Sequence, residues 1–274
     1  MIMKMHRLRR AIRDFIPPLR TDLVRATRLG PLCLLIVVAI TGCQSTDRAH
    51  PTAEYVLAYL KTGPRSGELT PAQSKEVFAG HMANIRRLGE ARQLVIAGPF
   101  DHPHDASWRG IFVLDVPTTQ QAAGLVQSDP AVQAQIFVVE LCPMKASPAL
   151  RQTHDLEQQL RASQSQPAEQ APGQPPPNIR AYVMITSSDA AKTERTLKAT
   201  VLGSKVVWWG RLDGERAGQG VFVLDEESID RVKTALSESK ADFAECTIDG
   251  WWSSKSISKL PAEAGWGLGL GGRH

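Results

Sequence analysis

This sequence lacks the short motifs that identify several large enzyme classes. It contains no G-x-x-x-x-G-K-[ST] phosphate loop, no G-x-S-x-G nucleophile elbow and no C-x-x-C pair. Phosphate-loop nucleotide hydrolysis, serine-hydrolase chemistry and dithiol redox chemistry therefore have no support. No cofactor-binding motif stands in their place, so we expect no cofactor.

The folded part of the chain also lacks an excess of basic charge. The formal net charge is +4, but residues 1–42 hold eight Lys or Arg side chains against Asp14 and Asp22. Removing these from the 32 basic and 28 acidic residues leaves 24 and 26. A nucleic-acid interface needs a basic patch on the folded part, so we expect no nucleic-acid partner.

The apolar run Gly30–Gly42 is too short to cross a membrane comfortably. It has 13 residues, whereas a spanning helix needs about 20. The run follows a basic segment, as in a signal peptide, and ends in Ile40-Thr41-Gly42-Cys43, which resembles a bacterial lipobox. The sequence predicts a lipoprotein signal peptide over 1–42 and a lipid on Cys43 that anchors the chain to the bacterial membrane. We expect it in the cell envelope, facing the periplasm or exterior, with the outer membrane favoured over the inner. An uncleaved anchor is the alternative.

Only four cysteines are present, and the signal accounts for two of them. Cys33 would leave with the signal peptide, and Cys43 would carry the lipid. Cys142 and Cys246 remain, in a compartment where disulfides form. Their places in the hydrophobic pattern are not equivalent, so two buried free thiols are favoured over a disulfide.

Hydrophobic patterning predicts a mixed α+β domain after a polar tether at 43–52. Thr70-Pro71 places an N-cap before a proline at the first helical position. The predicted elements are strand Tyr55–Leu60, helix Pro71–Glu90, strands Gln93–Phe100 and Arg109–Val116, helix Thr118–Gln127 and strand Gln135–Leu141. Their β-α-β-β-α-β order is the ferredoxin-like motif.

The same pattern returns later in the chain. Gly220–Asp225 (GVFVLD) repeats Gly110–Asp115 (GIFVLD) almost letter for letter, with flanking elements in the same order. Two such copies indicate a duplication. The predicted units are a domain at 53–145, a Gln- and Pro-rich linker at 146–178, a degenerate second domain at 179–260 and a Gly-rich tail at 261–274.

The second copy keeps the strand pattern but not the polar residues. Alignment at constant offsets sets Thr193 opposite His81, and Ser239 opposite Asp129. We therefore expect any chemistry to lie in the first copy, with the second as its structural partner.

Five stretches of the first copy match one family in order. They are Tyr55–Gly63 (YVLAYLKTG), Gly80–Leu88 (GHMANIRRL), Leu94–Phe100 (LVIAGPF), Arg109–Val113 (RGIFV) and Ser128–Val132 (SDPAV). The first copy thus resembles the YCII-related (YciI-like) family, and the other copy resembles a degenerate member. The resemblance implies two ferredoxin-like domains that form an intramolecular dimeric α+β barrel, in which the tandem copy replaces the partner of a homodimer.

The resemblance also implies a His and an Asp together in a pocket, as an acid/base pair. These map onto His81 and Asp129. The carboxylate of such a pair fixes the tautomer and raises the basicity of the imidazole, which can then move a proton near neutral pH. The alternatives are a helix-face histidine with a local hydrogen bond, and an Asx turn or N-cap at Asp129.

Three further residues are candidates for binding a ligand. Gly98 and Pro99 end the second predicted strand, and Arg109 begins the third. Arg109 would meet an anionic group, although a surface cation is the alternative.

Two other groups of residues suggest ligands but have simpler explanations. His102, His104 and Asp105 carry metal-binding atoms, yet their spacing matches no specific site, so no metal is predicted. Trp208-Trp209 and Trp251-Trp252 suggest ligand stacking. Strand residues alternate faces, so one Trp of each pair is expected in the core.

Two functions remain open. The first is a lipid-anchored envelope protein that binds a small polar ligand in the first-copy pocket, which the eroded second copy favours. The second is an enzyme of lyase or isomerase type that uses His81 and Asp129 as an acid/base pair, which the intact first copy favours.

Overall fold

The computed structural model describes residues 51–101, 103–163, 176–239, 243, 245–261 and 264–265. The predicted signal peptide, Cys43, most of the tether, His102 and most of the Gly-rich tail lie outside the described residues. The described residues belong to one unit, Arg48–His274. Among them, no helix is both long and apolar enough to cross a membrane.

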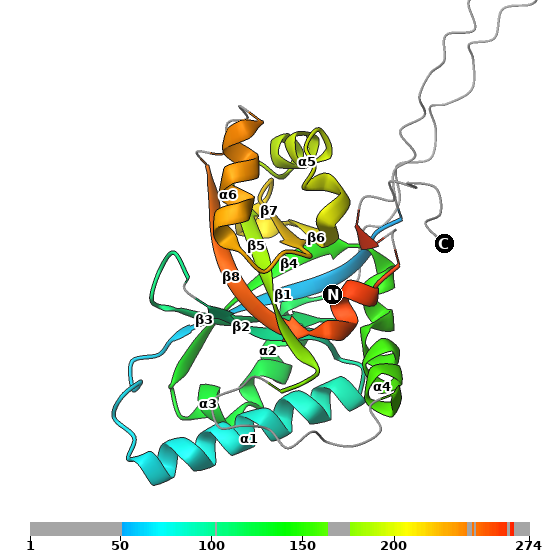
Figure 1. The fold of residues 1–274 in the computed structure, drawn as a ribbon. Helices are drawn as coiled ribbons and strands as arrows, with labels where there is room; N and C mark the ends of the chain where they lie inside the picture. Colours follow the sequence, from blue (N-terminus) through cyan, green and yellow to red (C-terminus); the bar gives the residue numbers. More distant parts are fainter. Residues whose placement is uncertain are drawn as a thin grey trace, which may run out of the picture. The chain divides into compact units, whose positions relative to one another are not determined.

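Eight antiparallel strands close into a barrel in the order β1-β3-β2-β8-β5-β7-β6-β4 (Figure 1). The first half of the molecule supplies β1 (Ala53–Thr62), β2 (Leu94–Asp101), β3 (Trp108–Leu114) and β4 (Phe137–Ala146). The second half supplies β5 (Ile179–Ser187), β6 (Val206–Leu212), β7 (Gly220–Leu224) and β8 (Cys246–Ser254). Both halves use the same relative strand order. The expected α+β class and closed barrel are thus confirmed.

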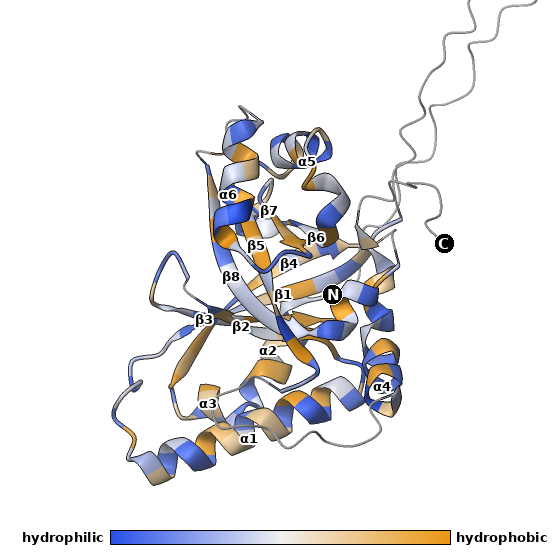
Figure 2. Cartoon of the chain, in the orientation of Figure 1, coloured by the Kyte–Doolittle hydropathy of each residue, from blue (hydrophilic) through white to orange (hydrophobic). Residues whose placement is uncertain are grey.

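Helices pack on the outside of this barrel. The α-helices are α1 (Pro71–Glu90), α2 (Thr119–Gln127), α3 (Pro130–Gln133), α4 (Thr153–Ser163), α5 (Ala190–Lys198) and α6 (Ile229–Glu238). Short 3-10 helices are η1 (Pro148–Gln152), η2 (Gly203–Lys205), η3 (Gly214–Arg216) and η4 (Lys255–Lys259). Figure 2 shows apolar strands beneath helices that carry both polar and apolar residues.

Helix α1 begins and ends where the sequence predicts. The Thr70 hydroxyl accepts from the backbone N–H of Gln73, and the Gln73 side chain accepts from the Thr70 backbone, which forms a capping box. Pro71 follows at the first helical position. The capping box and the proline fix where α1 begins, and therefore which of its side chains face the sheet.

The apolar side chains form an interior cluster and two outer clusters. The interior of the barrel is filled by large rings, and Trp208 and Trp251 lie there fully buried with ring centroids 6.4 Å apart. One outer cluster lies under α1 and α2, and the other under α5 and α6. Because strand residues alternate faces, each Trp pair sends one member inward, as predicted.

The two halves meet along two seams, which we call the β2–β8 seam and the β4–β6 seam. At the first, Trp251 Nε1 donates to the Gly98 carbonyl at 3.0 Å, and Ser253 Oγ donates to the Ala97 carbonyl at 2.7 Å. At the second, Met144 pairs with Leu212. Each half therefore covers the sheet edges of the other, which protects strands that would otherwise be open to pairing with another chain.

The segment 146–178 is a linker only in part. Strand β4 extends to Ala146, and η1 and α4 follow it up to Ser163. Leu150 is fully buried and belongs to the barrel core. The segment holds three leucines, Leu150, Leu156 and Leu160, among many polar residues, and their spacing does not show that Leu150 enters the barrel core. Residues 146–163 of the predicted linker are therefore part of the fold, and residues 164–175 lie outside the described part of the chain.

The start of the predicted tail also packs on the fold. Ala264 is fully buried, and the carbonyl of Gly265 accepts from Trp209 Nε1 at 3.0 Å. Cys142 and Cys246 are both free thiols.

Candidate functional site

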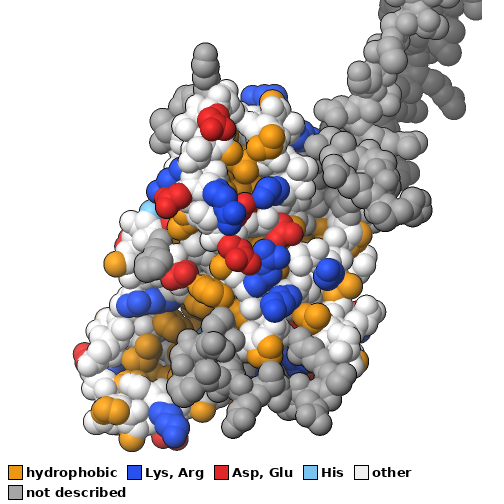
Figure 3. All heavy atoms as spheres, in the orientation of Figure 1, with side chains coloured by type: hydrophobic (Ala, Val, Ile, Leu, Met, Phe, Trp, Pro, Cys, Tyr) orange, Lys and Arg blue, Asp and Glu red, His pale blue; other side chains and the backbone are white. Residues whose placement is uncertain are grey.

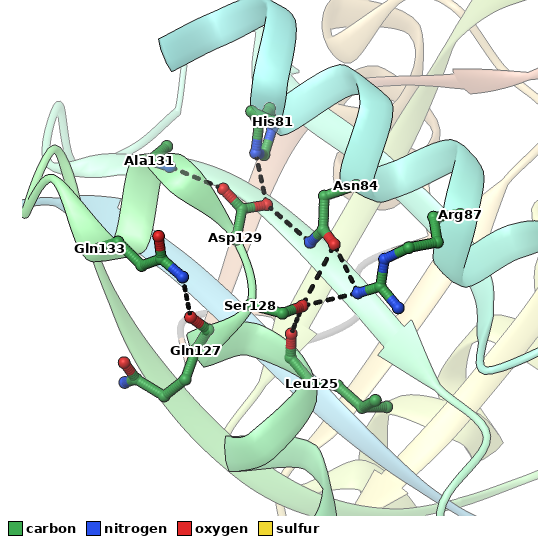
Figure 4. Close-up of polar contacts among 9 residues, drawn as sticks. All are labelled: His81, Asn84, Arg87, Leu125, Gln127, Ser128, Asp129, Ala131 and Gln133. Atoms are coloured by element: carbon green, nitrogen blue, oxygen red, sulfur yellow. Dashed lines mark hydrogen bonds and ion pairs between the residues drawn. The ribbon is translucent and has the colours of Figure 1, made fainter.

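His81 and Asp129 form a direct, buried hydrogen bond. His81 Nδ1 lies 2.7 Å from Asp129 Oδ2, and the two side chains are 8% and 1% exposed. They are 48 residues apart in sequence. The fold thus brings together the two residues that the sequence resemblance singled out (Figure 4).

The position of Asp129 is fixed by the start of α3. Asp129 is the N-cap of this helix, and its Oδ1 accepts from the backbone N–H of Ala131 at 2.9 Å. The Asn84 side chain donates to Oδ2 at 3.4 Å. The N-cap that the sequence allowed as an alternative therefore coexists with the contact to His81.

A second layer of polar contacts supports the pair. Arg87 donates to Asn84 Oδ1 at 2.7 Å and to Ser128 Oγ at 2.8 Å. The Ser128 hydroxyl lies 3.1 Å from Asn84 Oδ1 and donates to the Leu125 carbonyl at 2.6 Å. Figure 4 shows these side chains bridging α1 and the turn between α2 and α3. The network holds Asn84 beside Asp129.

Close approach of α1 and α3 depends on Gly80. A Cβ at this position would lie 2.8 Å from Cγ of Pro130. The absence of a side chain lets the two helices approach until His81 reaches Asp129. The motif residues at 80–88 and 128–132 thus form one interlocked junction.

Aromatic rings surround the imidazole of His81. Phe112 stacks on it with ring centroids 5.9 Å apart, and Phe137 meets it edge-on at 5.4 Å. Phe78 lies at 5.9 Å and is 60% exposed. An apolar shell of this kind weakens screening by water and strengthens the His–carboxylate interaction.

A cleft of about 440 Å³ lies beside this junction. It is formed by α2, α3 and the outer face of β4, and Phe137 is part of its wall. Val126 and Val139 add apolar surface, while Gln127 and Gln133 add amide groups. Phe137 therefore contacts both His81 and the cleft.

The Asp129 carboxyl is ionised near neutral pH. Burial by itself would raise its pKa, but the hydrogen bond and charge of His81, with the N–H groups of Ala131 and Asn84, hold the pKa below its usual 3.8. The carboxylate accepts from Nδ1, so a neutral His81 carries its proton there. The Nε2 atom then remains as an acceptor or base.

Gly98 and Pro99 lie on β2, and Arg109 lies on the neighbouring strand β3. Pro99 pairs with Gly110 in the β2–β3 ladder, and Arg109 Nε donates to Thr62 Oγ1 at 2.8 Å. A Cβ on Gly98 would overlap the carbonyl oxygen of Trp252. Gly98 thus lets β8 pack closely at the β2–β8 seam.

A second His–carboxylate pair is not predicted from the sequence. His104 Nδ1 lies 2.9 Å from Oδ2 of Asp249, a residue of β8. The sequence does single out His104, but with His102 and Asp105 as neighbours. Its partner in the fold lies 145 residues away, and no local signal connects them.

No protein-family model and no curated protein matches the chain. Among solved structures, it is similar to two mutants of chlorite dismutase from Candidatus Nitrospira defluvii and to a heme-binding protein from Thermus thermophilus. The first mutant has a TM-score of 0.47 at 10% identity, covering 77% of this chain and 95% of that chain. The second mutant has a TM-score of 0.46 at 9% identity, covering 79% of this chain and 96% of that chain. The heme-binding protein has a TM-score of 0.39 at 13% identity, covering 75% of this chain and 93% of that chain. This similarity is too low to assign a ligand or an activity.

Proposed function

We propose that this chain is a tandem member of the YCII-related family that binds a small polar ligand at the His81–Asp129 junction. In this proposal the two halves are ferredoxin-like units that replace the subunits of a homodimer. The shared strand order of the halves supports the duplication. The convergence of the motif residues 80–88 and 128–132 on one junction supports the family.

The 2.7 Å hydrogen bond between His81 and Asp129 carries the proposal. It orients the imidazole and fixes its tautomer, which leaves Nε2 to bind a donor group. The ligand would enter from the cleft beside α2, α3 and β4, with Phe137 as the movable wall between the cleft and His81.

The test separates the two ring nitrogens of His81. In His81→Asn, the amide still donates to Asp129 but Nε2 is lost, whereas His81→Ala removes both groups. A library of small polar fragments would be screened by ligand-observed NMR against the full-length chain. We expect hits that compete for one site and that lose affinity about tenfold or more in His81→Asn. Equal affinity in wild type and His81→Asn would refute a site at Nε2.

The same geometry supports proton transfer as a second candidate function. A neutral His81 held by an ionised carboxylate can act as a general base through Nε2 and return the proton as a general acid. A substrate among the fragment hits would then be converted by the wild type. His81→Asn would bind it weakly and turn it over at least about a hundredfold more slowly. Binding without turnover would leave the first function standing and reject this one.

We also propose that Cys43 carries a lipid that holds the domain in the bacterial cell envelope, with the outer membrane favoured. The basic n-region, the short apolar run and the lipobox-like ending support this. Metabolic labelling with a palmitate analogue is the test. Label on the wild type that disappears in Cys43→Ala is expected. Undiminished label on Cys43→Ala would defeat the proposal.

A further inference from the structure

The turn between β2 and β3 contacts the second half through His104. Its backbone N–H donates to Asp249 Oδ1 at 2.6 Å, and its ring Nδ1 lies 3.0 Å and 2.9 Å from the two carboxylate oxygens. Figure 1 shows this turn beside β8, below α6. The pair therefore spans the β2–β8 seam, and neither half could form it alone.

Asp249 orients the His104 ring from inside the fold. The Asp249 side chain is fully buried, while that of His104 is 34% exposed. Nδ1 is directed at the carboxylate, so a neutral ring carries its proton there and leaves Nε2 unprotonated. Trp108 fixes the ring further by an edge contact at 5.0 Å. The exposed edge of the ring thus carries an oriented hydrogen-bond acceptor.

The opposite seam carries an arginine at the corresponding place in its turn. Arg216 lies six residues after Gly210, as His104 lies six residues after Gly98. Its Nε donates to Glu140 at 2.5 Å across the β4–β6 seam, and its Nη1 donates to Gln219 at 3.1 Å. A guanidinium only donates hydrogen bonds. His104 also pairs with a carboxylate across a seam, but through one ring nitrogen, so its second ring nitrogen is not used in that contact.

A cleft of about 460 Å³ adjoins the exposed edge of His104. Its wall contains the carboxylates of Asp101, Glu227 and Asp230, together with the ammonium of Lys233. Glu227 also meets Arg180 at 3.2 Å, whereas Asp230 is exposed in the first turn of α6. The charged side chains that line the cleft are therefore net acidic.

Apolar residues also line the same cleft. They are Ala181, Ile229 and Ile248, which contribute methyl and methylene surface. Carboxylates favour charged N–H donors, and apolar lining favours a hydrocarbon spacer. The chemistry of the lining matches a short aliphatic amine.

The geometry points to a second ligand site in this cleft, which takes a small amine-bearing cation. His104 Nε2 accepts an N–H of the ligand, Asp249 holds the ring in place, and Asp230 meets a second positive group. Both halves contribute to the site. It is separate from the His81 junction and does not depend on the function proposed there.

Calorimetric titration of the full-length chain with 1,4-diaminobutane tests the site. His104→Asn keeps a donor for Asp249 but removes Nε2, and Asp230→Asn changes an exposed side chain that the fold does not require. We expect saturable binding by the wild type that weakens about tenfold in each variant. His81→Asn is the matched control at the other pair and should bind the diamine as the wild type does.

The outcomes separate a ligand site from a contact that only joins the halves. Absence of diamine binding by the wild type would overturn the proposal. So would unchanged affinity in both His104→Asn and Asp230→Asn, or equally tight binding of the dicarboxylate succinate. A spectrum of the ¹⁵N-labelled imidazoles should show the His104 Nε2 resonance moving with diamine while that of His81 stays in place.

Discussion

The helix junctions of the two halves share a scaffold but differ in chemistry. The buried positions are His81, Asn84 and Leu88 on α1, and Ala190, Thr193 and Leu197 on α5. The spacing is identical, so the packing sets Ala190 opposite His81 and Thr193 opposite Asn84. Alignment at a constant offset sets Thr193 opposite His81 instead. It fails because α5 is shorter and η2 lengthens the connection that follows it.

The polar contacts at the helix junction of the second half, between α5 and the end of α6, are neutral. Those of the first half, around His81 and Asp129, include a charged carboxylate. Ser128 ends α2 and Ser239 ends α6, and each hydroxyl donates to a carbonyl of the preceding turn at 2.6 Å. Ser239 therefore corresponds to Ser128 and not to Asp129. Thr193 meets Ser187 Oγ at 2.7 Å, a short neutral contact in place of an ion pair. One scaffold thus supports either a polar site or a plain packing contact.

The largest difference between the halves should come from their N-cap aspartates. Asp129 caps α3 and also receives His81, whereas Asp189 caps α5 through the N–H of Lys192 at 2.9 Å. Asp129→Ala should lower the free energy of unfolding by about 4 kcal/mol, since a buried pair loses one member. Asp189→Ala should cost about 1 kcal/mol, as ordinary caps do. Urea denaturation measures both, and equal losses would mean that His81 adds nothing to the cap.

The two seams should differ in their tolerance of a methyl group. Gly98 and Gly210 occupy corresponding places, but a Cβ on Gly98 meets the backbone oxygen of Trp252, and one on Gly210 meets the flexible side chain of Met144. Gly98→Ala should therefore destabilise by about 3 kcal/mol and Gly210→Ala by about 1 kcal/mol. Thermal unfolding compares them. A larger loss at Gly210 would show that Met144 cannot move aside.

Two glycines of α1 allow a finer comparison within the first half. A Cβ at Gly80 would press on Pro130, whereas nothing lies within 4 Å of one at Gly89. Gly80→Ala should destabilise by about 1–2 kcal/mol through the crowded junction. Gly89→Ala should stabilise by about 0.5–1 kcal/mol, because alanine is the better helix former. If Gly80→Ala also stabilises the fold, then α1 and α3 can accommodate a methyl group between them, and their close approach does not depend on Gly80.

The smallest effect should appear only in acid. The pKa of Asp129 in the fold lies below its unfolded value of 3.8, because the contacts of the carboxylate with His81, Ala131 and Asn84 outweigh the effect of burial. The ionised carboxylate therefore stabilises the fold above about pH 4, and this stabilisation is lost as the pH falls through the folded-state pKa. The difference in unfolding free energy between wild type and Asp129→Asn should shrink as the pH falls below about 4. A constant difference down to about pH 2 would contradict the lowered pKa.

The face of the molecule drawn in Figure 3 does not show the difference between the halves. On the face drawn in Figure 3, acidic and basic side chains alternate over the described residues, and apolar side chains lie between them. The distinction between the halves is buried, at Ala190 and His81. The charge on this face therefore does not locate the site.

Several features follow from the sequence alone, because their causes are local. A cap at Thr70, a proline at position 71 and the apolar spacing determine α1, and face alternation places one Trp of each pair inside. The pairing of His81 with Asp129 was also predictable, but through the motifs that surround them and not through their spacing.

Other features were decided only by the tertiary structure. The β2–β8 and β4–β6 seams close the barrel because each half has two open sheet edges that the other covers, and no local pattern encodes that choice. The burial of Leu150, the docking of Ala264 and the contact of His104 with Asp249 follow from this closure. Sequence periodicity reports which face of an element is buried, but not which distant residue lies against it.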